Sequence, residues 1–268
     1  MKQRPSIPDG LEDIEASYWM AYYQSKNRMT THASVISGAM ACALPEFDAL
    51  AYNRVIGLKQ GCASNREMLK NLIQFYRMAG SQRFMIQLPP QLVYELVACT
   101  LETEGFTHHN NWSKIIRGTE PLQAKTNPEL TIKRIDKQGA SVFGEVIYNC
   151  FDWEHKELPT LLSSSVGREG YRHYAVHYQG QVIAVGALYA EGRGAAMAFA
   201  ATRPEFRGLG AQTLLLKTRI DEARRQGAEW ICSETGQHFP ERPVKSYQNM
   251  IKAGFNLAYQ RQNWLYTF

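Results

Sequence analysis

The clearest chemical signal in the sequence is a glycine-rich turn between an expected strand and an expected helix. It consists of Arg207, Gly208, Leu209, Gly210, Ala211 and Gln212. Glycines in such a turn let backbone N–H groups approach a phosphate without an intervening Cβ, and the amino end of a helix adds partial positive charge. The arginine can add a charge-assisted hydrogen bond. The turn therefore predicts a site for a polyanion, with a tight turn that binds nothing as the alternative.

Other short patterns exclude familiar sites. No Gly-Lys-Ser/Thr follows the glycine-rich turn, so it is not a Walker A loop, and its spacing does not fit G-x-G-x-x-G either. His108 and His109 are adjacent, so on a strand they point to opposite faces and cannot share a metal ion. The five cysteines lie far apart with no C-x-x-C pair, which indicates reduced thiols and predicts no metal site.

Composition places the chain among ordinary globular proteins. It has 268 residues, of which 44% are hydrophobic and 21% are charged, and this excludes wholesale disorder. Thirty Lys and Arg against 25 Asp and Glu give a net charge of +5, which suits an anionic small molecule as well as nucleic acid. No basic cluster with interleaved aromatics supports nucleic acid. No signal peptide or membrane span is visible, so we expect a cytoplasmic protein without a membrane partner.

The glycine-rich turn must be positioned by a chain of alternating strands and helices. Apolar spacing predicts helices over 11–28, from Ser64 or Asn65 to 78, and over 91–104, 139–150, 211–226 and 245–252. It predicts strands over 52–58, 83–88, 112–117, 131–135, 171–177, 182–190, 195–202, 230–234 and 259–268. The charged run KTRIDEARR at 217–225 is expected to form a solvated helix face.

Two parts of the chain resemble each other. Residues 77–89 and 224–236 share a helix end, a glycine, a turn and an apolar strand, and a Gly-Phe pair and an Asn-Trp pair follow each at similar distances. Chance is the alternative, because these anchors are short. A repeat predicts an α/β (α+β) fold of two mixed-sheet units in tandem, with a central twisted sheet flanked by helices. The polar stretch 118–128 would join domains 1–122 and 123–268.

The second unit resembles a known family. The stretch FAATRPEFRGLGAQTLLLKTR at 199–219, followed by Ser246, Asn249 and Gly254-Phe255, is similar to the GNAT superfamily of acyl-CoA-dependent N-acyltransferases. The resemblance implies acetyl-CoA as cosubstrate, with its pyrophosphate on the glycine-rich turn. Gln212 departs from the Gly or Ala usual at its position. The implied contacts with the rest of the cofactor come from Phe199, Ala200, Ala201 and Thr202 on the strand and from Ser246 and Asn249 on a later helix. Close packing of the strand, and an exposed polar helix face, are the alternatives.

The resemblance also directs the search for acid and base. Many GNAT enzymes use a tyrosine as the acid four residues before the glycine of Gly-Phe, and here that position is Met250. Tyr247 is the substitute we choose, although a CoA thiolate can leave without a dedicated acid. The base that is common in the family is missing from the strand 195–202, so Glu234 at the end of the next strand becomes the first candidate. A solvated carboxylate is the alternative for Glu234.

The region after the first helix of this unit, from Asp152 to His155, lines the acceptor pocket in the family. Trp153 within it could cover an apolar acceptor or simply pack. In the first unit the corresponding loop KQGCASN, at 59–65, lacks the family's glycine pattern. That unit is therefore expected to be a degenerate GNAT-like domain that serves as scaffold or as one wall of the acceptor site.

The expected function is an N-acetyltransferase that moves an acetyl group from acetyl-CoA to a primary amine by direct attack in a ternary complex. The acceptor would be a small amine or a peptide, and the protein a monomer or homodimer without metal or nucleic acid. A non-catalytic acyl-CoA-binding or regulatory module is the alternative.

Overall fold

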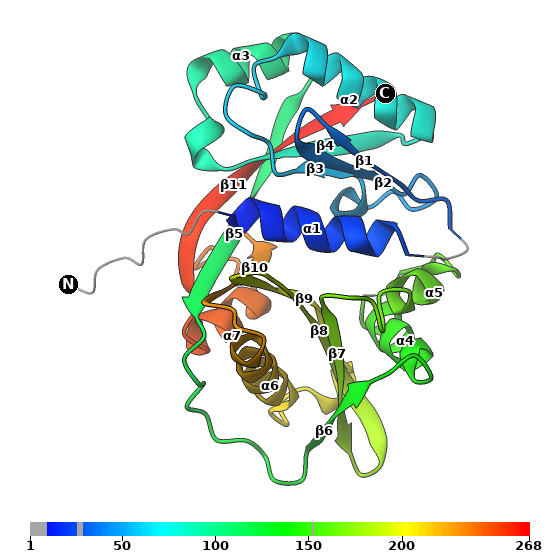
Figure 1. Cartoon of the computed structure of the whole chain (residues 1–268), viewed down its shortest axis with the longest axis vertical. Coiled ribbons are helices and arrows are strands. Elements are labelled where there is room, and N and C mark those ends of the chain that lie inside the picture. The colour runs from blue at the N-terminus through cyan, green and yellow to red at the C-terminus, as the bar shows by residue number, and fades with distance from the viewer. Residues whose placement is uncertain (1–9, 26–28, 152) are drawn as a thin grey trace, which may run out of the picture.

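The fold is built on one large mixed sheet with helices on both faces (Figure 1). The computed structural model describes residues 10–25, 29–151 and 153–268. Within these ranges eleven strands form a single sheet in the order β1-β2-β3-β4-β11-β5-β10-β9-β8-β7-β6. All neighbours are antiparallel except two pairs, β3 with β4 and β9 with β10. The expected α/β (α+β) fold with a central sheet flanked by helices is confirmed.

The first half of the chain supplies the upper part of the sheet. Its elements are α1 (Leu11–Tyr23), β1 (His32–Ile36), β2 (Ala39–Ala43), β3 (Arg54–Ile56), α2 (Arg66–Ala79), β4 (Arg83–Leu88), α3 (Glu95–Thr103) and β5 (Thr107–Gly118). The expected strand 52–58 is shorter, because residues 50–52 form a 3₁₀ turn. The expected first helix extends to residues 26–28, which lie outside the described residues. The β1–β2 hairpin was not expected, because β2 is buried at every position and its sequence shows no alternation.

The second half supplies the lower part of the sheet. Its elements are β6 (Thr131–Ile135), α4 (Ala140–Cys150), α5 (Leu158–Ser163), β7 (Tyr171–Tyr178), β8 (Gln181–Glu191), β9 (Gly194–Thr202), α6 (Ala211–Arg225), β10 (Trp230–Gly236), α7 (Lys245–Lys252) and β11 (Asn256–Thr267). Only α5 was not expected. The tight β7–β8 turn occurs at Gln179 and Gly180, both of which have positive φ.

The two halves exchange their final strands. Strand β5 of the first half lies between β10 and β11, and β11 of the second half lies between β4 and β5. Strands β4 and β10 therefore take equivalent places, each between a parallel neighbour and an exchanged antiparallel strand. These are the two segments that the repeat aligned. Because the sheet continues through the junction, the division at residue 122 stays a prediction.

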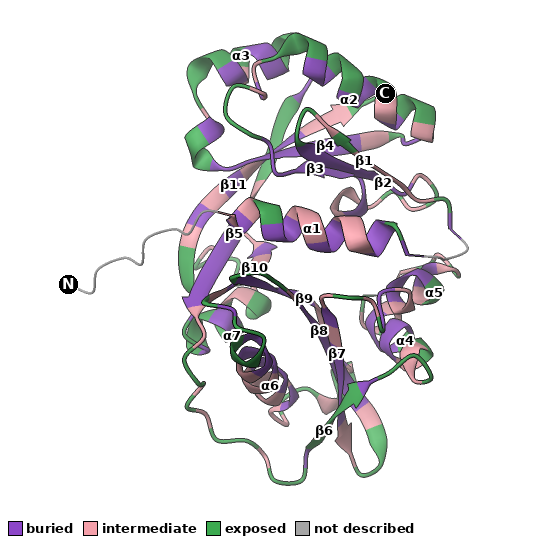
Figure 2. Ribbon diagram, viewed as in Figure 1, coloured by how far each residue is buried: buried purple, intermediate pink, exposed green. Residues whose placement is uncertain are grey.

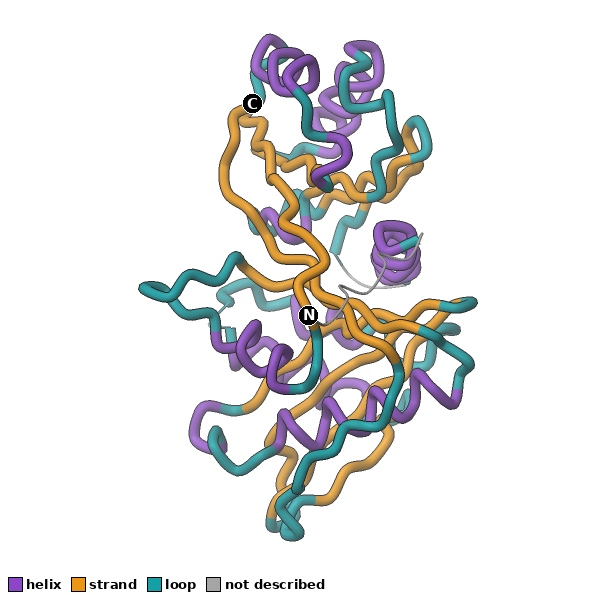
Figure 3. The backbone as a smooth tube through the Cα atoms, turned by 90° about the vertical axis from the view of Figure 1, so that its left-hand side faces the viewer, coloured by secondary structure: helices purple, strands orange, loops and turns teal. Residues whose placement is uncertain are grey.

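Helix α1 belongs to the first half but packs against both halves. It contacts β1, β2 and β3 on one side and β8 and β9 on the other. Figure 3 shows this helix end-on, between the two parts of the sheet, and its inner side is buried in Figure 2. Helices α6 and α7 cover the opposite face of the second half. The region around α1 thus becomes the place where residues from both halves meet.

Candidate active site

Strands β9 and β10 separate after a short parallel pairing. The ladder joins Gly194, Ala195 and Ala196 to Trp230, Ile231 and Cys232 and then ends, whereas β9 stays paired with β8 as far as Thr202. We call the gap between residues 197–202 of β9 and 233–236 of β10 the fork. In the described part of the chain no strand covers the β9 edge that faces the fork. Its backbone groups can therefore form hydrogen bonds with an extended ligand.

The residues expected to bind the pantetheine arm lie along this open edge. Phe199, Ala200, Ala201 and Thr202 form the last four positions of β9. The register with β8 shifts here, because Gly186 pairs with Ala200 and Ala187 with Ala198, and Phe199 is left as the extra residue of a β-bulge. At the apex of the fork, Ser233 Oγ donates a hydrogen bond to the Met197 carbonyl at 3.3 Å. The structure thus brings the expected strand residues together on one edge.

The glycine loop, residues 207–212, follows β9 directly. Gly208 and Gly210 have φ of 92° and 90°, in the left-handed region that favours glycine, and a Cβ on either would meet no described atom within 4 Å. Helix α6 starts at Gly210, and no side chain among the described residues caps its amino end. The first N–H groups of a helix have no partner within it, so this end is suited to an anion. Arg207 beside it is exposed.

The departure at Gln212 has a structural explanation. Its amide Nε2 donates to Thr202 Oγ1 at 2.8 Å, which ties the start of α6 to the end of β9. Arg207 Nε also donates to the Thr202 carbonyl, at 3.4 Å. Leu209 is half-buried, and its carbonyl accepts from Asn127 Nδ2 at 3.3 Å. The loop is therefore held from three sides while its glycines stay accessible.

Helix α7 presents two different faces. Ser246 and Asn249 are exposed, as a ligand-binding face or a solvated one requires. Met250 is buried beneath α7 with Ile115 and Phe255, so the position of the family's tyrosine serves the core here. The Tyr247 ring stacks on His238, with centroids 4.9 Å apart and planes at 11°. Within the part of the chain that the structure describes, Tyr247 forms no hydrogen bond with Glu234, so these two candidate catalytic groups are not joined directly.

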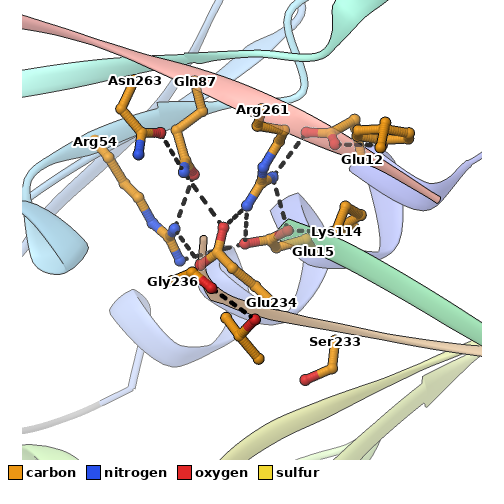
Figure 4. Close-up of polar contacts among 12 residues, drawn as sticks. Glu12, Glu15, Arg54, Gln87, Lys114, Ser233, Glu234, Gly236, Arg261 and Asn263 are labelled. Atoms are coloured by element: carbon orange, nitrogen blue, oxygen red, sulfur yellow. Dashed lines mark hydrogen bonds and ion pairs between the residues drawn. The ribbon is translucent and has the colours of Figure 1, made fainter. Parts of the chain in front are cut away.

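Glu234 lies beside the fork in a buried cluster of charges (Figure 4). Its Oε1 accepts from Arg54 Nη1 at 2.7 Å, and its Oε2 pairs with Arg261 and accepts from Gln87 Nε2 at 3.3 Å. The side chain is only 15% exposed. The alternative of a solvated carboxylate is therefore wrong. Arg54 and Gln87 come from β3 and β4, so the first half of the chain contacts the fork directly.

The same cluster extends to helix α1. Glu15 pairs with Lys114, with Arg54 at 3.3 Å and with Arg261 at 2.8 Å. Burial alone would raise the pKa of Glu15, but the charges of Arg261, Lys114 and Arg54 hold it well below its usual value. Glu12 joins the cluster through Arg261 at 3.0 Å. Three carboxylates and three cations thus balance one another at the junction of the two halves.

A family comparison covers the fork and the glycine loop. A family model described as an acetyltransferase (GNAT) domain matches residues 145–238, from within α4 through the fork and the glycine loop to just beyond β10. Over these residues the expected resemblance to the GNAT superfamily is confirmed. No curated protein matches the sequence at a significant level.

Solved GNAT structures share the fold over nearly the whole chain. A GCN5-related N-acetyltransferase from Kribbella flavida has a TM-score of 0.66 at 13% identity and covers 97% of this chain and 96% of its own. A tandem GNAT protein from the clavulanic acid biosynthesis pathway has a TM-score of 0.65 at 12% identity and covers 98% and 89%. A GCN5-related N-acetyltransferase from Sphaerobacter thermophilus has a TM-score of 0.62 at 10% identity and covers 85% and 80%. The GNAT fold therefore extends beyond the segment that the family model matches.

Aromatic side chains cover the α1 side of the fork. Trp19 and Tyr22 of α1 contact Phe199, with ring centroids 5.6 Å and 5.3 Å apart. Trp153 meets the edges of Phe47 and Tyr52 from the first half, at 5.6 Å and 5.9 Å. The neighbouring candidate Asp152 lies outside the described residues. The packing interpretation of Trp153 therefore has contacts to support it, and those contacts also join the two halves.

Outside the fork, a cavity of about 440 Å³ opens beside the end of β6 and the start of β7. His173 lies at this cavity, buried against Phe143 and Tyr171, and its Nε2 is 3.0 Å from Ser165 Oγ. Burial and then the charge of Arg134 lower the pKa of His173 to about 3. The histidine is therefore neutral at physiological pH.

His108 rests edge-on against Trp264 and is near Asn111, and no group of three potential metal ligands occurs among the described residues. In the run 217–225 the prediction of a solvated face is wrong for Arg219 and Glu222, which are buried. Within residues 10–25, 29–151 and 153–268, no helix is long and apolar enough to cross a membrane.

Proposed function

We propose that the protein is an acyl-CoA-dependent N-acyltransferase that moves an acetyl group from acetyl-CoA to a primary amine. The observation that supports this most strongly is the open edge of β9 leading directly into the uncapped amino end of α6. An extended arm can pair with the first, and a pyrophosphate can bind the second.

In this proposal the pyrophosphate accepts hydrogen bonds from the N–H groups of residues 208–212 and from Arg207. The pantetheine arm pairs with the backbone of Phe199, Ala200, Ala201 and Thr202 as a short additional strand. Ser246 and Asn249 bind the arm from the exposed face of α7. The thioester then lies within the fork, close to the bulge in β9.

The chemistry is direct attack in a ternary complex. The neutral amine nitrogen forms a bond to the thioester carbonyl carbon, the C–S bond breaks, and the amine proton passes to a base. Glu234 is the proposed base because β10 carries it beside the fork, where Arg54 and Arg261 fix its carboxylate. Tyr247 is the proposed donor to the CoA thiolate. Because that thiolate is a good leaving group, water can replace Tyr247 in this step.

We further propose that residues 1–122 form a degenerate GNAT-like domain and residues 123–268 the acetyl-CoA-binding domain. The first domain would supply one wall of the acceptor site, through Trp19 and Tyr22 at Phe199. Two observations favour the rival function, a non-catalytic acyl-CoA-binding module. Both oxygens of Glu234 already accept from partners, and Met250 cannot donate a proton.

The test has two parts. Calorimetric titration with acetyl-CoA measures binding, and a thiol reagent then follows CoA release while a panel of small amines and peptide amino termini is offered. Binding together with amine-dependent CoA release supports the enzyme. Binding without release from any amine supports the rival module, and a lack of acetyl-CoA binding overturns both functions.

A further inference from the structure

The linker between β5 and β6, residues 119–130, lies against helix α6 (Figure 1). Lys217 of α6 donates through its Nζ to the Leu122 carbonyl at 3.4 Å. Nearer the start of the helix, Asn127 Nδ2 donates to the Leu209 carbonyl at 3.3 Å. The polar composition of this stretch predicted a connection between domains. The structure also ties it to α6 and to the glycine loop.

The side-chain amide of Asn127 is held in one orientation. Its Oδ1 accepts from the Glu129 N–H at 3.0 Å, in a turn where an asparagine side chain bonds the backbone two residues on. Because the amide oxygen is occupied in this way, the amide nitrogen is left to donate to Leu209. The Leu209 carbonyl has no partner within α6, since the first acceptor of that helix is the Gly210 carbonyl, which binds the Leu214 N–H at 3.1 Å.

The hydrogen bond from Asn127 sets the direction of the peptide unit between Leu209 and Gly210. This peptide bond is trans, so the Gly210 N–H points opposite to the Leu209 carbonyl and therefore away from Asn127. Among the residues that the structure describes, the Gly210 N–H has no acceptor, and a Cβ on Gly210 would meet no atom within 4 Å. This N–H can therefore donate to an anion at the amino end of α6.

The same peptide unit could turn over easily if its carbonyl were not held. Turning it over changes the φ of Gly210 from 90° to a negative value, and glycine adopts both signs at little cost. The Leu209 carbonyl oxygen, which carries partial negative charge, would then face the anion site, and the Gly210 N–H would face the linker. The hydrogen bond from Asn127 opposes this change.

We propose that Asn127 is a positioning residue of the cofactor site, which holds the peptide unit between Leu209 and Gly210 so that its N–H faces the pyrophosphate of the bound cofactor. The linker is then part of this site as well as a connection between two domains. The inference rests on the proposed function, because it requires acetyl-CoA on the glycine loop. The effect of Asn127 passes through one peptide unit.

The experiment compares ligands with and without a pyrophosphate and requires no acceptor amine. NMR titrations of the wild type and Asn127→Ala use acetyl-CoA, ADP, which has a pyrophosphate but no pantetheine arm, and S-acetylpantetheine, which has the arm and the thioester but no pyrophosphate. Affinity for acetyl-CoA and ADP should fall about tenfold in the variant, the usual effect of one lost hydrogen bond to a charged group. Affinity for S-acetylpantetheine should stay unchanged. ADP should shift the Gly210 amide resonance downfield in the wild type and much less in the variant.

Matched variants separate the loss of the donor from other effects. Thr126→Ala truncates the exposed neighbour in the linker and should leave all three affinities unchanged. Asn127→Asp keeps an oxygen for the Glu129 N–H but has no donor for the Leu209 carbonyl. Thr126→Asp adds the same charge and keeps the donor, so affinity for acetyl-CoA should be lower in Asn127→Asp than in Thr126→Asp.

The outcomes distinguish this inference from the function on which it rests. Equal affinities for acetyl-CoA in the wild type and Asn127→Ala would overturn the role of Asn127. The same factor of loss for S-acetylpantetheine as for acetyl-CoA would also overturn it, because the effect would then not concern the pyrophosphate. A wild-type protein that does not bind acetyl-CoA overturns the proposed function instead.

Discussion

Helices α2 and α6 occupy equivalent places in the two halves but begin in different ways. Each follows a strand of a short parallel pair, β3 with β4 and β9 with β10. Helix α2 is closed by Asn65, whose side chain accepts from the Met68 N–H at 3.1 Å. Helix α6 starts at the left-handed Gly210 and has no side-chain cap within the described residues. An N–H group in the first turn of α2 donates to a side chain of the protein, whereas the first N–H groups of α6 have no side-chain acceptor and can donate to a ligand.

The strands before these helices differ in the same way. Arg54 of β3 donates to Gln87 of β4 at 2.8 Å, so side chains bridge the first parallel pair. Beyond its apex at Ser233, the fork between β9 and β10 has no such bridge among the described residues. A binding site on this fold therefore depends on hydrogen-bonding groups that the chain leaves without a partner. In the first half one side-chain hydrogen bond joins β3 to β4, and one side chain caps α2.

The buried charge cluster contains residues of both halves, and a change in it should have the largest effect. Lys114→Met leaves the buried Glu15 without its nearest cation and should cost about 3–5 kcal/mol of unfolding free energy. Lys59→Met removes an exposed ion pair between the loop residue Lys59 and Asp13 of α1, and should cost about 0–1 kcal/mol. Denaturant unfolding measures both. Equal losses would mean that the buried cluster contributes no more to stability than an exposed ion pair.

Gly210→Leu tests the open helix end. A side chain in the left-handed region is strained and obstructs the anion site, so acetyl-CoA affinity should fall at least ~100-fold, or about 2.8 kcal/mol. The matched control is Gly61→Leu in the loop before α2, where φ is 81° and a Cβ would also meet open space. Calorimetric titration should find acetyl-CoA affinity unchanged in this control. A similar loss in both variants would contradict the assignment of binding to the second half alone.

A third test uses His173, a buried histidine of the second half. Its pKa in the folded protein is about 3, below the ordinary 6.5, so the unfolded chain binds the extra proton as the pH falls below 6.5. The contribution of the neutral His173 to the free energy of unfolding is complete above pH 6.5, and it should fall by about 1.4 kcal/mol per pH unit below that value. Denaturant unfolding between pH 7 and pH 5 should show this slope in the wild type. His173→Gln should reduce it, and an unchanged slope in that variant would assign the effect to another group.

The smallest expected effect comes from opening the closed helix. Asn65→Ala should cost about 1 kcal/mol of unfolding free energy, because the Met68 N–H loses its acceptor. It should not create a second cofactor site, since the loop 59–65 holds a single glycine. Denaturant unfolding gives the first value, and calorimetry counts acetyl-CoA sites. A second binding site in this variant would show that the cap alone keeps the first half from binding.

Local signals predicted the parts of the site that depend on neighbours in sequence. The glycine loop, the start of α6 and the edge residues of β9 lie within about 15 residues of one another, so turn chemistry and periodicity suffice to find them. The charge cluster could not be found in this way, because Glu15 and Arg261 are 246 residues apart. Arg219 lies in a charged stretch whose composition is typical of a solvated helix face. Its burial depends on the carbonyls of Ala187 and Ala198 that accept its hydrogen bonds at the bulge in β9. The strand exchange has no local signal either.

The exchange of β5 and β11 has a consequence for synthesis of the protein. Strand β4 and most of β5 acquire their shared neighbour only when residues 256–267, near the end of the sequence, have left the ribosome. Until then the nascent first half presents unpaired strand edges, which are prone to pairing with other chains. Contacts between residues so distant in sequence also form slowly. We expect that nascent chains stalled before β11 will require chaperones, and that truncation there will impair both halves together.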